Sequence, residues 1–363
     1  MPEDDIEAIA RAFQIPGRFR GAERSSQGHI HATWVSTFEL EGARRRYLHQ
    51  RLNERVFADP LGLMANLERV LDHLRASGDP GATRRSLEWV ASRAGSSSYR
   101  APDGSLWRSF VYLEGTRSLT QVPSVDQASE AARAFAEFVR DLSDLAPESL
   151  CETIPHFHDL ATRLAELERA VRADPLARVA EAGAEIDAVR AHAPLVREMA
   201  ELGLPVRVTH NDTKLDNVLF DRAGRRAVCV IDLDTVMAGS VLFDFGDLVR
   251  TAACAVAEDS REPERATLRL DLFEALARGY LAGASDLLTP AEVEHFELGC
   301  QLMPLLIGSR FLTDHLLGDR YFQIQRPGQN LDRARVQLGL LASIEGSRRP
   351  IEEALRRAGR VVG

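Results

Sequence analysis

The sequence is almost without lysine. Its 45 lysine and arginine residues comprise 44 arginines and a single lysine, Lys214, in the segment THNDTKLDN at 209–217. A genome that favours arginine codons would replace exposed lysines at little cost, which the base composition of the gene can test. We therefore expect Lys214 to occupy a site that needs a compact ammonium on a flexible stem and does not fit a broad, planar guanidinium.

Long apolar runs, a secretion signal and paired cysteines are also absent. No apolar run approaches the ~20 residues of a membrane-spanning helix, so no membrane partner is expected. The opening residues, MPEDDIEAIARAF, are acidic and lack the basic end and apolar run of a secretion signal. The cysteines form no CxxC pair, which predicts reduced thiols in a cytoplasmic protein: Cys151, Cys229, Cys254 and Cys300.

Basic charge is in deficit as well. The chain has 45 basic and 54 acidic residues and a net charge of −9, which argues against nucleic acid as a partner but leaves room for a small anionic ligand. Its 45% of apolar and 27% of charged residues are typical of a globular protein. A mass of 40.2 kDa is sufficient for one large domain or two lobes.

The N-terminal third combines strand-like stretches with one helix. Alternating apolar and polar residues predict strands near 30–38 and 47–52, and a further strand at 107–113. Between them, Asp59 followed by Pro60 is typical of a helix start, and apolar residues continue from there at helical spacing. We therefore expect a small mixed β/α lobe.

The rest of the chain is mostly helical by pattern. Capping boxes begin helices at Ser124 and at Thr289. Only the stretch 206–232 has the pattern of strand, loop and strand. The sequence thus predicts an α+β fold of two lobes, a small N-lobe at 1–115 and a larger, mostly helical C-lobe at 116–363.

The strand–loop–strand stretch carries a cluster of polar residues. After a β-like segment come His210, Asp212, Lys214 and Asn217. This is the spacing H-x-D-x-x-x-x-N of the kinase catalytic loop, in which the aspartate accepts the proton of the substrate hydroxyl. We predict this role for Asp212, and we predict that Lys214 contacts the phosphoryl group in transfer.

The hairpin that follows predicts a metal site. Residues 218–220 and 227–231 are strand-like and joined by a turn, so the open ends of the hairpin meet. Asn217 stands at one end, and Asp232 and Asp234 follow the other. Amide and carboxylate oxygens suit Mg²⁺, which takes few protein ligands together with substrate phosphates. We predict Asn217, Asp232 and Asp234 as metal ligands.

Asp244 offers an alternative metal ligand, because Asp244-Phe245-Gly246 spells the DFG signature of protein kinases. It lies 27 residues beyond Asn217, after the hairpin, and it opens an apolar helix. We expect Asp244 to cap that helix or to brace the catalytic loop, and we assign the metal to Asp232 on the geometry of the hairpin.

The phosphate-binding cover is hard to recognise because the motif GxGxxG is absent. The small-residue loop 25–31 is the best candidate and supplies Gly28 and His29 as nucleotide contacts. In kinase folds a basic residue on the third strand holds the α- and β-phosphates. We predict Arg51 in this role, with Glu68 on the following helix as its partner; an exposed surface position for both stays open.

These motifs resemble the aminoglycoside/choline phosphotransferase branch of the protein-kinase-like fold, and within it the chain is most similar to the N-acetylhexosamine 1-kinases. The catalytic-loop match is specific to the fold, whereas the later matches favour the sugar kinases. The matching stretches extend over nearly the whole chain: 28–30, 50–53, 56–60, 107–108, 154–159 with Arg163, 210–221, 308–314, 318–322 and 330–335.

The resemblance implies a protein-kinase-like fold, ATP and Mg²⁺ as cofactors, and phosphorylation of an amino-sugar at its anomeric hydroxyl. Arg310, Asp314 and Tyr321 are candidate sugar contacts, although a structural role at helix ends stays open. His31 stands where asparagine is expected, near the phosphates or the sugar, and is a further candidate substrate contact. The expected partners are ATP and a sugar or amino-sugar.

Three functions stay open from the sequence. The first is a kinase for the C1 hydroxyl of an N-acetylhexosamine, and the second is a kinase for an aminoglycoside, an amino alcohol such as choline, or another sugar. The third, an inactive nucleotide-binding scaffold, is disfavoured because Asp212, Asn217 and Asp232 are all present. The sequence does not identify the acceptor, because an acceptor pocket is assembled from distant side chains. It does not give the oligomeric state either.

Overall fold

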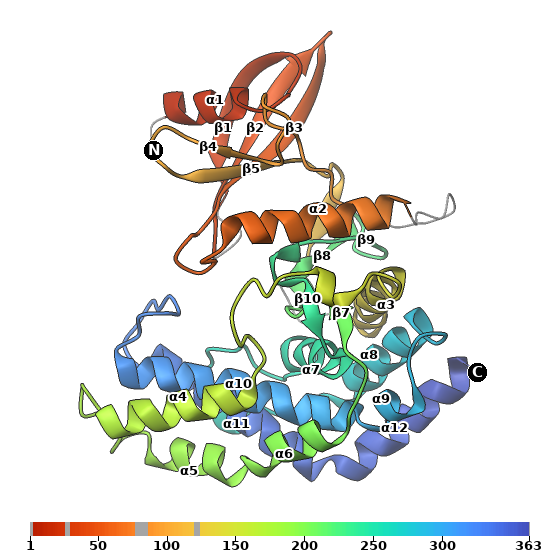
Figure 1. The fold of residues 1–363 in the computed structure, drawn as a ribbon. Helices are drawn as coiled ribbons and strands as arrows, with labels where there is room; N and C mark the ends of the chain where they lie inside the picture. The colour runs from red at the N-terminus through yellow and green to blue at the C-terminus, as the bar shows by residue number, and fades with distance from the viewer. Residues whose placement is uncertain (1–2, 26–29, 77–85, 120–123, 363) are drawn as a thin grey trace.

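The computed structural model describes residues 3–25, 30–76, 86–119 and 124–362 and has two lobes (Figure 1). The N-lobe is a five-stranded antiparallel sheet in the order β1-β2-β3-β5-β4. Helix α1 packs on one face of this sheet and α2 on the other. The elements of the N-lobe are α1 Glu3–Arg11, β1 Arg18–Arg24, β2 Ala32–Leu40, β3 Ala43–Arg51, α2 Pro60–Ala76, β4 Ser98–Arg100 and β5 Leu106–Val111.

Alternation along the strands gives the N-lobe sheet two different faces. Trp107 packs in the apolar cluster of α1, on what is termed here the outer face. Phe110 packs in the cluster of α2 and the C-lobe, on the inner face. The pairing of β3 with β5 sets Arg51 opposite Trp107 and Gln50 opposite Arg108. Because successive strand residues point to opposite faces, Arg51 belongs to the outer face and Arg108 to the inner face.

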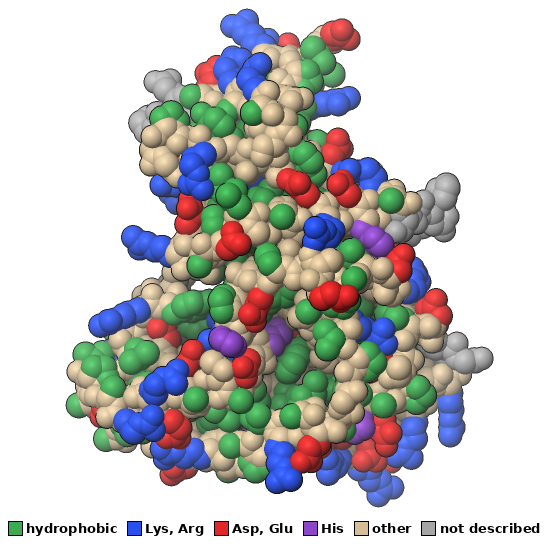
Figure 2. Space-filling view, in the orientation of Figure 1, with side chains coloured by type: hydrophobic (Ala, Val, Ile, Leu, Met, Phe, Trp, Pro, Cys, Tyr) green, Lys and Arg blue, Asp and Glu red, His purple; other side chains and the backbone are tan. Residues whose placement is uncertain are grey.

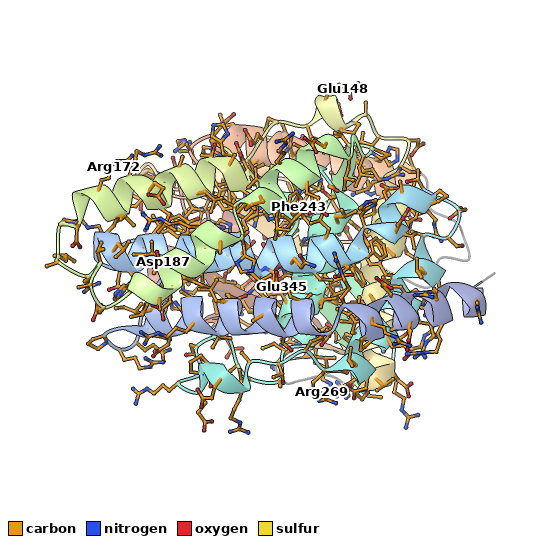
Figure 3. All side chains as sticks on the ribbon, turned by 90° about the horizontal axis from the view of Figure 1, so that it is seen from below. Glu148, Arg172, Asp187, Phe243, Arg269 and Glu345 are labelled. Carbon is orange, nitrogen blue, oxygen red and sulfur yellow. The ribbon has the colours of Figure 1, made fainter. Side chains whose placement is uncertain are left out.

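The C-lobe is mostly helical and carries two small sheets below α2 (Figure 1). One sheet has the order β6-β8-β9, and the other is the antiparallel pair of β7 and β10. Seen from below, α10 and α11 run side by side across the lobe (Figure 3). The elements are β6 Thr116–Ser118, α3 Val125–Asp141, α4 Leu160–Ala173, α5 Gly183–Ala191, α6 Pro194–Glu201, β7 Arg207–Thr209, β8 Val218–Asp221, β9 Ala227–Val230, β10 Met237–Gly239, α7 Val241–Ala252, α8 Leu270–Gly283, α9 Pro290–Glu294, α10 Phe296–Leu317, α11 Gln329–Gly346 and α12 Arg348–Val362.

The two-lobe α+β prediction is confirmed, and so are the capping boxes at Ser124 and Thr289. The helix start at Pro60 is also confirmed, because Oδ1 of Asp59 accepts a hydrogen bond from the N–H of Gly62 at 2.9 Å. The expectation of strands only within 206–232 of the C-lobe was wrong. β6 and β10 lie outside that stretch, and strands of three residues carry too little alternation to be recognised.

No helix in the described part of the chain combines the length and the apolar character needed to cross a bilayer.

Candidate active site

An aspartate from a neighbouring helix holds the catalytic loop, residues 210–217. The two carboxylate oxygens of Asp244, on α7, accept hydrogen bonds from the backbone N–H of His210 at 2.9 Å and of Asn211 at 2.7 Å. The Thr213 hydroxyl donates to the Asp244 carbonyl at 2.5 Å. Burial raises the pKa of Asp244 to about 6. The prediction that Asp244 braces the catalytic loop is therefore confirmed.

Asp212, Lys214 and Asn217 form one connected set. The Lys214 ammonium lies 2.8 Å from Oδ1 of Asp212. The Asn217 amide donates from Nδ2 to the Asp212 carbonyl at 2.8 Å and to its Oδ2 at 3.0 Å. Burial opposes the charge on both groups, but Lys214 lowers the pKa of Asp212, and the carboxylates of Asp212 and Asp247 raise the pKa of Lys214. Both side chains are therefore charged near neutral pH.

The open ends of the hairpin meet as the sequence predicted. The Ile231 N–H donates to the Asn217 carbonyl at 2.9 Å, and Asp232 follows with a positive φ of 59°. Neither Oδ1 of Asn217 nor the Asp232 carboxylate has a hydrogen-bond donor among the described residues. Burial, and then the charges of Asp234 and Asp212, raise the pKa of Asp232 to about 7. An excess of negative charge beside free oxygens fits a divalent cation.

Magnesium would depend on further ligands from the substrate. Within the described ranges no group of three or more His, Cys, Asp and Glu side chains could hold a metal ion. Asn217 and Asp232 supply two oxygens, and Mg²⁺ usually completes its octahedron with phosphate oxygens and water. The residues present fit a metal that arrives together with a nucleotide.

Asp234 does not fit the predicted role of metal ligand. Arg108 donates to its Oδ1 at 2.5 Å and to its Oδ2 at 2.9 Å, and Nε2 of His31 lies 2.5 Å from the same Oδ2. Burial opposes the ionised form of Asp234, but Arg108 and His31 outweigh it and lower its pKa. Both oxygens are thus occupied by protein, and we correct the prediction on this ground.

The prediction that His31 contacts the substrate needs the same correction. Its Nε2 faces Asp234, its Nδ1 accepts the backbone N–H of Asn53 at 3.1 Å, and its ring stacks on Phe57 with centroids 5.5 Å apart. Both ring nitrogens are thus used within the protein. His31 could be singled out from the sequence, but its partner, 203 positions away in the chain, could not.

Only some of the predicted nucleotide contacts lie among the described residues. Gly28 and His29 lie outside the described residues. Arg51 lies on the outer face, half exposed and 3.8 Å from the Asp103 carboxylate, so the prediction that it holds phosphates between the lobes was wrong. No ion pair joins it to Glu68 on α2 in the described part of the chain. The reason is strand register, because one residue changes the face of the sheet.

Arg310 lies among aromatic rings of the C-lobe. It donates from Nη2 to the Tyr321 hydroxyl at 3.2 Å, and its guanidinium lies 5.2–5.5 Å from the ring centroids of Phe157, Tyr321 and Phe322. No carboxylate of the described residues forms an ion pair with it. Burial lowers the pKa of Arg310. A half-buried cation without a carboxylate partner is suited to the oxygen atoms of a ligand.

Asp314 has a supporting position and is not placed to contact a sugar. Its carboxylate accepts the backbone N–H groups of Arg320, Tyr321 and Phe322 at 2.8–3.0 Å and the Asn330 amide at 3.0 Å. It therefore fixes the segment that carries Tyr321, and the predicted sugar contact is corrected to this role.

A cavity of about 490 Å³ opens beside the catalytic loop. Figure 2 shows this face hollowed below α2, with hydrophobic side chains in the hollow. His158 in its wall stacks on Phe157 at a centroid distance of 4.6 Å, and the tilted ring of Phe243 lies 5.2 Å away on centroids; Phe243 is labelled in Figure 3. Burial, and then the charge of Arg310, lower the pKa of His158 to about 3, so its ring is neutral.

Arg108 and His158 lie in the matching stretches 107–108 and 154–159, but the sequence did not predict their contact partners. The signal for Arg108 was its place beside Trp107 in a strand, where alternation sends the two side chains to opposite faces. Phe157 directly precedes His158 in the chain, whereas Phe243, the second ring beside it, comes from a distant segment.

The sequence model described as the phosphotransferase enzyme family matches residues 30–285 of the chain, which is more than half of its 363 residues.

Solved structures share the fold over nearly the whole chain. An aminoglycoside phosphotransferase from Alicyclobacillus acidocaldarius superposes with a TM-score of 0.57 at 15% identity, over 100% of this chain and 96% of that one. A choline kinase from Cryptosporidium parvum gives 0.58 at 12% identity, over 99% of each chain. A spectinomycin phosphotransferase in complex with ADP and spectinomycin gives 0.58 at 10% identity, over 96% of this chain and 99% of that one. At such identities the likeness shows the fold alone.

Proposed function

Because the chain belongs to the phosphotransferase enzyme family, we propose that it transfers the γ-phosphoryl group of ATP, with Mg²⁺, to a sugar hydroxyl. The acceptor proposed is the anomeric C1 hydroxyl of an N-acetylhexosamine such as N-acetylglucosamine or N-acetylgalactosamine. The observation that carries the proposal is the connected set of Asp212, Lys214 and Asn217 next to Asp232.

Each member of this set has a part in phosphoryl transfer. Asp212 orients the acceptor hydroxyl and accepts its proton while the oxygen attacks the γ-phosphorus and the bond to the β-phosphate oxygen breaks. Lys214 stabilises negative charge on the moving phosphoryl group, and Asn217 fixes the Asp212 carboxylate. Asn217 and Asp232 would hold Mg²⁺, which neutralises charge on the phosphates when bound.

The position of the Arg310 guanidinium favours a neutral, oxygen-rich acceptor over a cation at these rings. The three rings around Arg310 could otherwise surround a quaternary ammonium, but a guanidinium already lies over them. The charges of Arg310 and Arg163 act on His158 in one sense, and the carboxylate of Asp212 acts in the opposite sense. Sugar hydroxyls and an N-acetyl carbonyl have oxygen atoms that can accept hydrogen bonds from the arginine N–H groups.

Kinases of cationic acceptors are the second candidate, and the observation that favours them is the fold shared with an aminoglycoside phosphotransferase and a choline kinase. ADP release should be measured with N-acetylhexosamines, other sugars, aminoglycosides and amino alcohols. We expect turnover with an N-acetylhexosamine and a product whose phosphate is released in dilute acid, because anomeric phosphates hydrolyse there and ordinary phosphomonoesters do not. An acid-stable product, or turnover with choline or an aminoglycoside only, would overturn the assignment of the acceptor.

A further inference from the structure

A buried ion pair joins the two lobes behind the proposed metal site. Arg108 belongs to β5 of the N-lobe and Asp234 to the segment between β9 and β10 of the C-lobe, and their side chains are each 3% exposed. His31, just before β2, adds a second contact from the N-lobe to the same carboxylate. Two separate parts of the N-lobe thus meet at one aspartate of the C-lobe.

Each donor nitrogen around this aspartate has a partner within the protein. Nη1 and Nη2 of Arg108 bind Asp234 as a fork, and its Nε donates to Oε1 of Gln50 at 2.9 Å. Since Nδ1 of His31 accepts from the Asn53 backbone, its Nε2 carries the proton that faces Asp234. A planar guanidinium fixes distance and angle together, which a lysine would not do.

This contact is adjacent to the metal residues. Asp234 is two positions after Asp232, whose positive φ of 59° makes its backbone dependent on support from its surroundings. A carboxylate fixed at Asp234 therefore fixes the segment that presents Asp232 beside Asn217. It also fixes the distance between the inner face of the N-lobe sheet and the catalytic loop.

We propose that Arg108, Asp234 and His31 form a latch that holds the lobes at the separation a nucleotide needs and positions Asp232 for its metal. The three are positioning residues, and none of them ligates the metal. The proposal rests on the proposed function only in that the ligand between the lobes is a nucleotide. Nucleotide affinity reports the latch, because affinity falls with the fraction of molecules that are in the competent arrangement.

The test is a double-mutant cycle on ADP binding, with and without Mg²⁺, using Arg108→Met, Asp234→Asn and the pair together. The latch predicts that each single change weakens ADP binding about tenfold in both conditions. The double variant should bind no more weakly than the worse single, since both changes break one contact. Arg51→Met, on the outer face of the same sheet, is the matched control and should bind as the wild type does.

The same set of variants also shows whether weaker binding results from a loss of folding. Each single change leaves one buried charge without its partner, whereas the double variant removes both charges. If a single variant does not melt cooperatively, the double variant and Arg108→Lys decide instead. The double variant should still bind ADP about tenfold more weakly than the wild type, and Arg108→Lys should lie between the two.

Three results separate the alternatives. Loss of affinity only with Mg²⁺, seen in Asp234→Asn and not in Arg108→Met, would make Asp234 a metal ligand and overturn the latch. Wild-type affinity in the single variants, or in the double variant where a single does not fold, would overturn it as well. A wild-type protein that binds no ADP in either condition would instead refute the proposed function.

Discussion

At the scale of single residues, the surroundings of Lys214 explain why lysine persists there. Its ammonium reaches Asp212 at 2.8 Å. The Asp247 carboxylate also favours the charged form of the ammonium, and the charge of Arg250 opposes it. Arg250 itself is buried and paired with Asp247 at 2.8 Å. A second guanidinium at position 214 would compete for the same carboxylate next to an existing one, which a compact ammonium avoids.

Lys214→Arg tests this explanation. The variant keeps the charge, but its wider, planar group does not reproduce the contact with the phosphoryl group in the transition state. We expect kcat to fall ~10²-fold or more, comparable to the loss of one preorganised electrostatic contact, with ADP affinity largely retained. The kcat of Lys214→Met should fall by at least the same factor. Steady-state kinetics with Arg222→Lys on the exposed hairpin turn as control would check this, and wild-type kcat in Lys214→Arg would contradict it.

Asp232 and Asp244 are predicted to respond differently to removal. Asp232→Ala should abolish the gain in ADP affinity that Mg²⁺ provides, because it deletes a metal oxygen. Asp244→Ala should instead lower the melting temperature, because two buried N–H groups of the catalytic loop lose their acceptor. Calorimetric titration of ADP with and without Mg²⁺ measures the first effect, with the exposed Asp216→Ala as control. If Asp244→Ala instead abolished the gain from Mg²⁺ and Asp232→Ala did not, Asp244 would be assigned as the metal ligand.

At the scale of elements, the sequence predicted what is local and failed where distant elements meet. The catalytic loop and its hairpin were found because their residues are contiguous and their spacing fixes the geometry. Arg51 was misplaced because strand register decides the face of a side chain, and register depends on the partner strand. Asp234 was misassigned because its partners Arg108 and His31 lie in the other lobe. The position of Asp234 two residues after Asp232 does not indicate that Arg108 and His31 are its partners.

The short helix α9 is predicted to support the strand that leads into the catalytic loop. Glu292 on α9 is buried and accepts hydrogen bonds from Arg207 of β7 at 2.7 and 2.9 Å, and it also closes the capping box with Thr289. Glu292→Gln should lower the free energy of unfolding by about 3–5 kcal/mol, because it leaves a mostly buried arginine without its carboxylate. Denaturant unfolding measures this, and Glu294→Gln, exposed on the same helix, should change little.

The loss in Glu292→Gln should depend on pH. Burial opposes the ionised form of Glu292, but hydrogen bonds from Arg207 and Thr289 outweigh it and lower its pKa from the usual 4.5. A lowered pKa means that the ionised glutamate stabilises the fold above pH 4.5 and that this contribution is lost as the pH falls below it. The stability difference between wild type and variant should thus shrink in acid. A difference that is constant from pH 7 to pH 3 would contradict the ion pair.

At the scale of the whole molecule, the proposed function draws on both lobes. The sheet of the N-lobe covers the nucleotide in the proposed arrangement, and the C-lobe supplies the acceptor side with Phe157, Arg310 and Tyr321. These three come from a loop, from α10 and from the segment after it, so no short motif encodes the acceptor. The fold and the phosphotransferase family can therefore be predicted from this sequence, whereas the choice of acceptor depends on three-dimensional assembly.

Ligands that bind between the lobes should stabilise the whole chain. A ligand at 100 times its Kd adds about 2.7 kcal/mol to the stability of the native state. We expect the melting temperature to rise with a non-hydrolysable ATP analogue and Mg²⁺, and to rise again with an N-acetylhexosamine but not with choline. Differential scanning fluorimetry over a panel of sugars measures this. A further rise with choline and none with any sugar would favour the amino alcohol kinases.

The most direct measurement is single-turnover transfer of the labelled γ-phosphate of ATP to an N-acetylhexosamine, in the wild type and in Asp212→Asn. We predict that the wild type forms a labelled sugar phosphate. The variant should bind ADP as well as the wild type but transfer the label ~10²–10⁴-fold more slowly, the usual contribution of a positioned acid or base. Transfer by Asp212→Asn within a few-fold of the wild-type rate would show that Asp212 is not the catalytic aspartate.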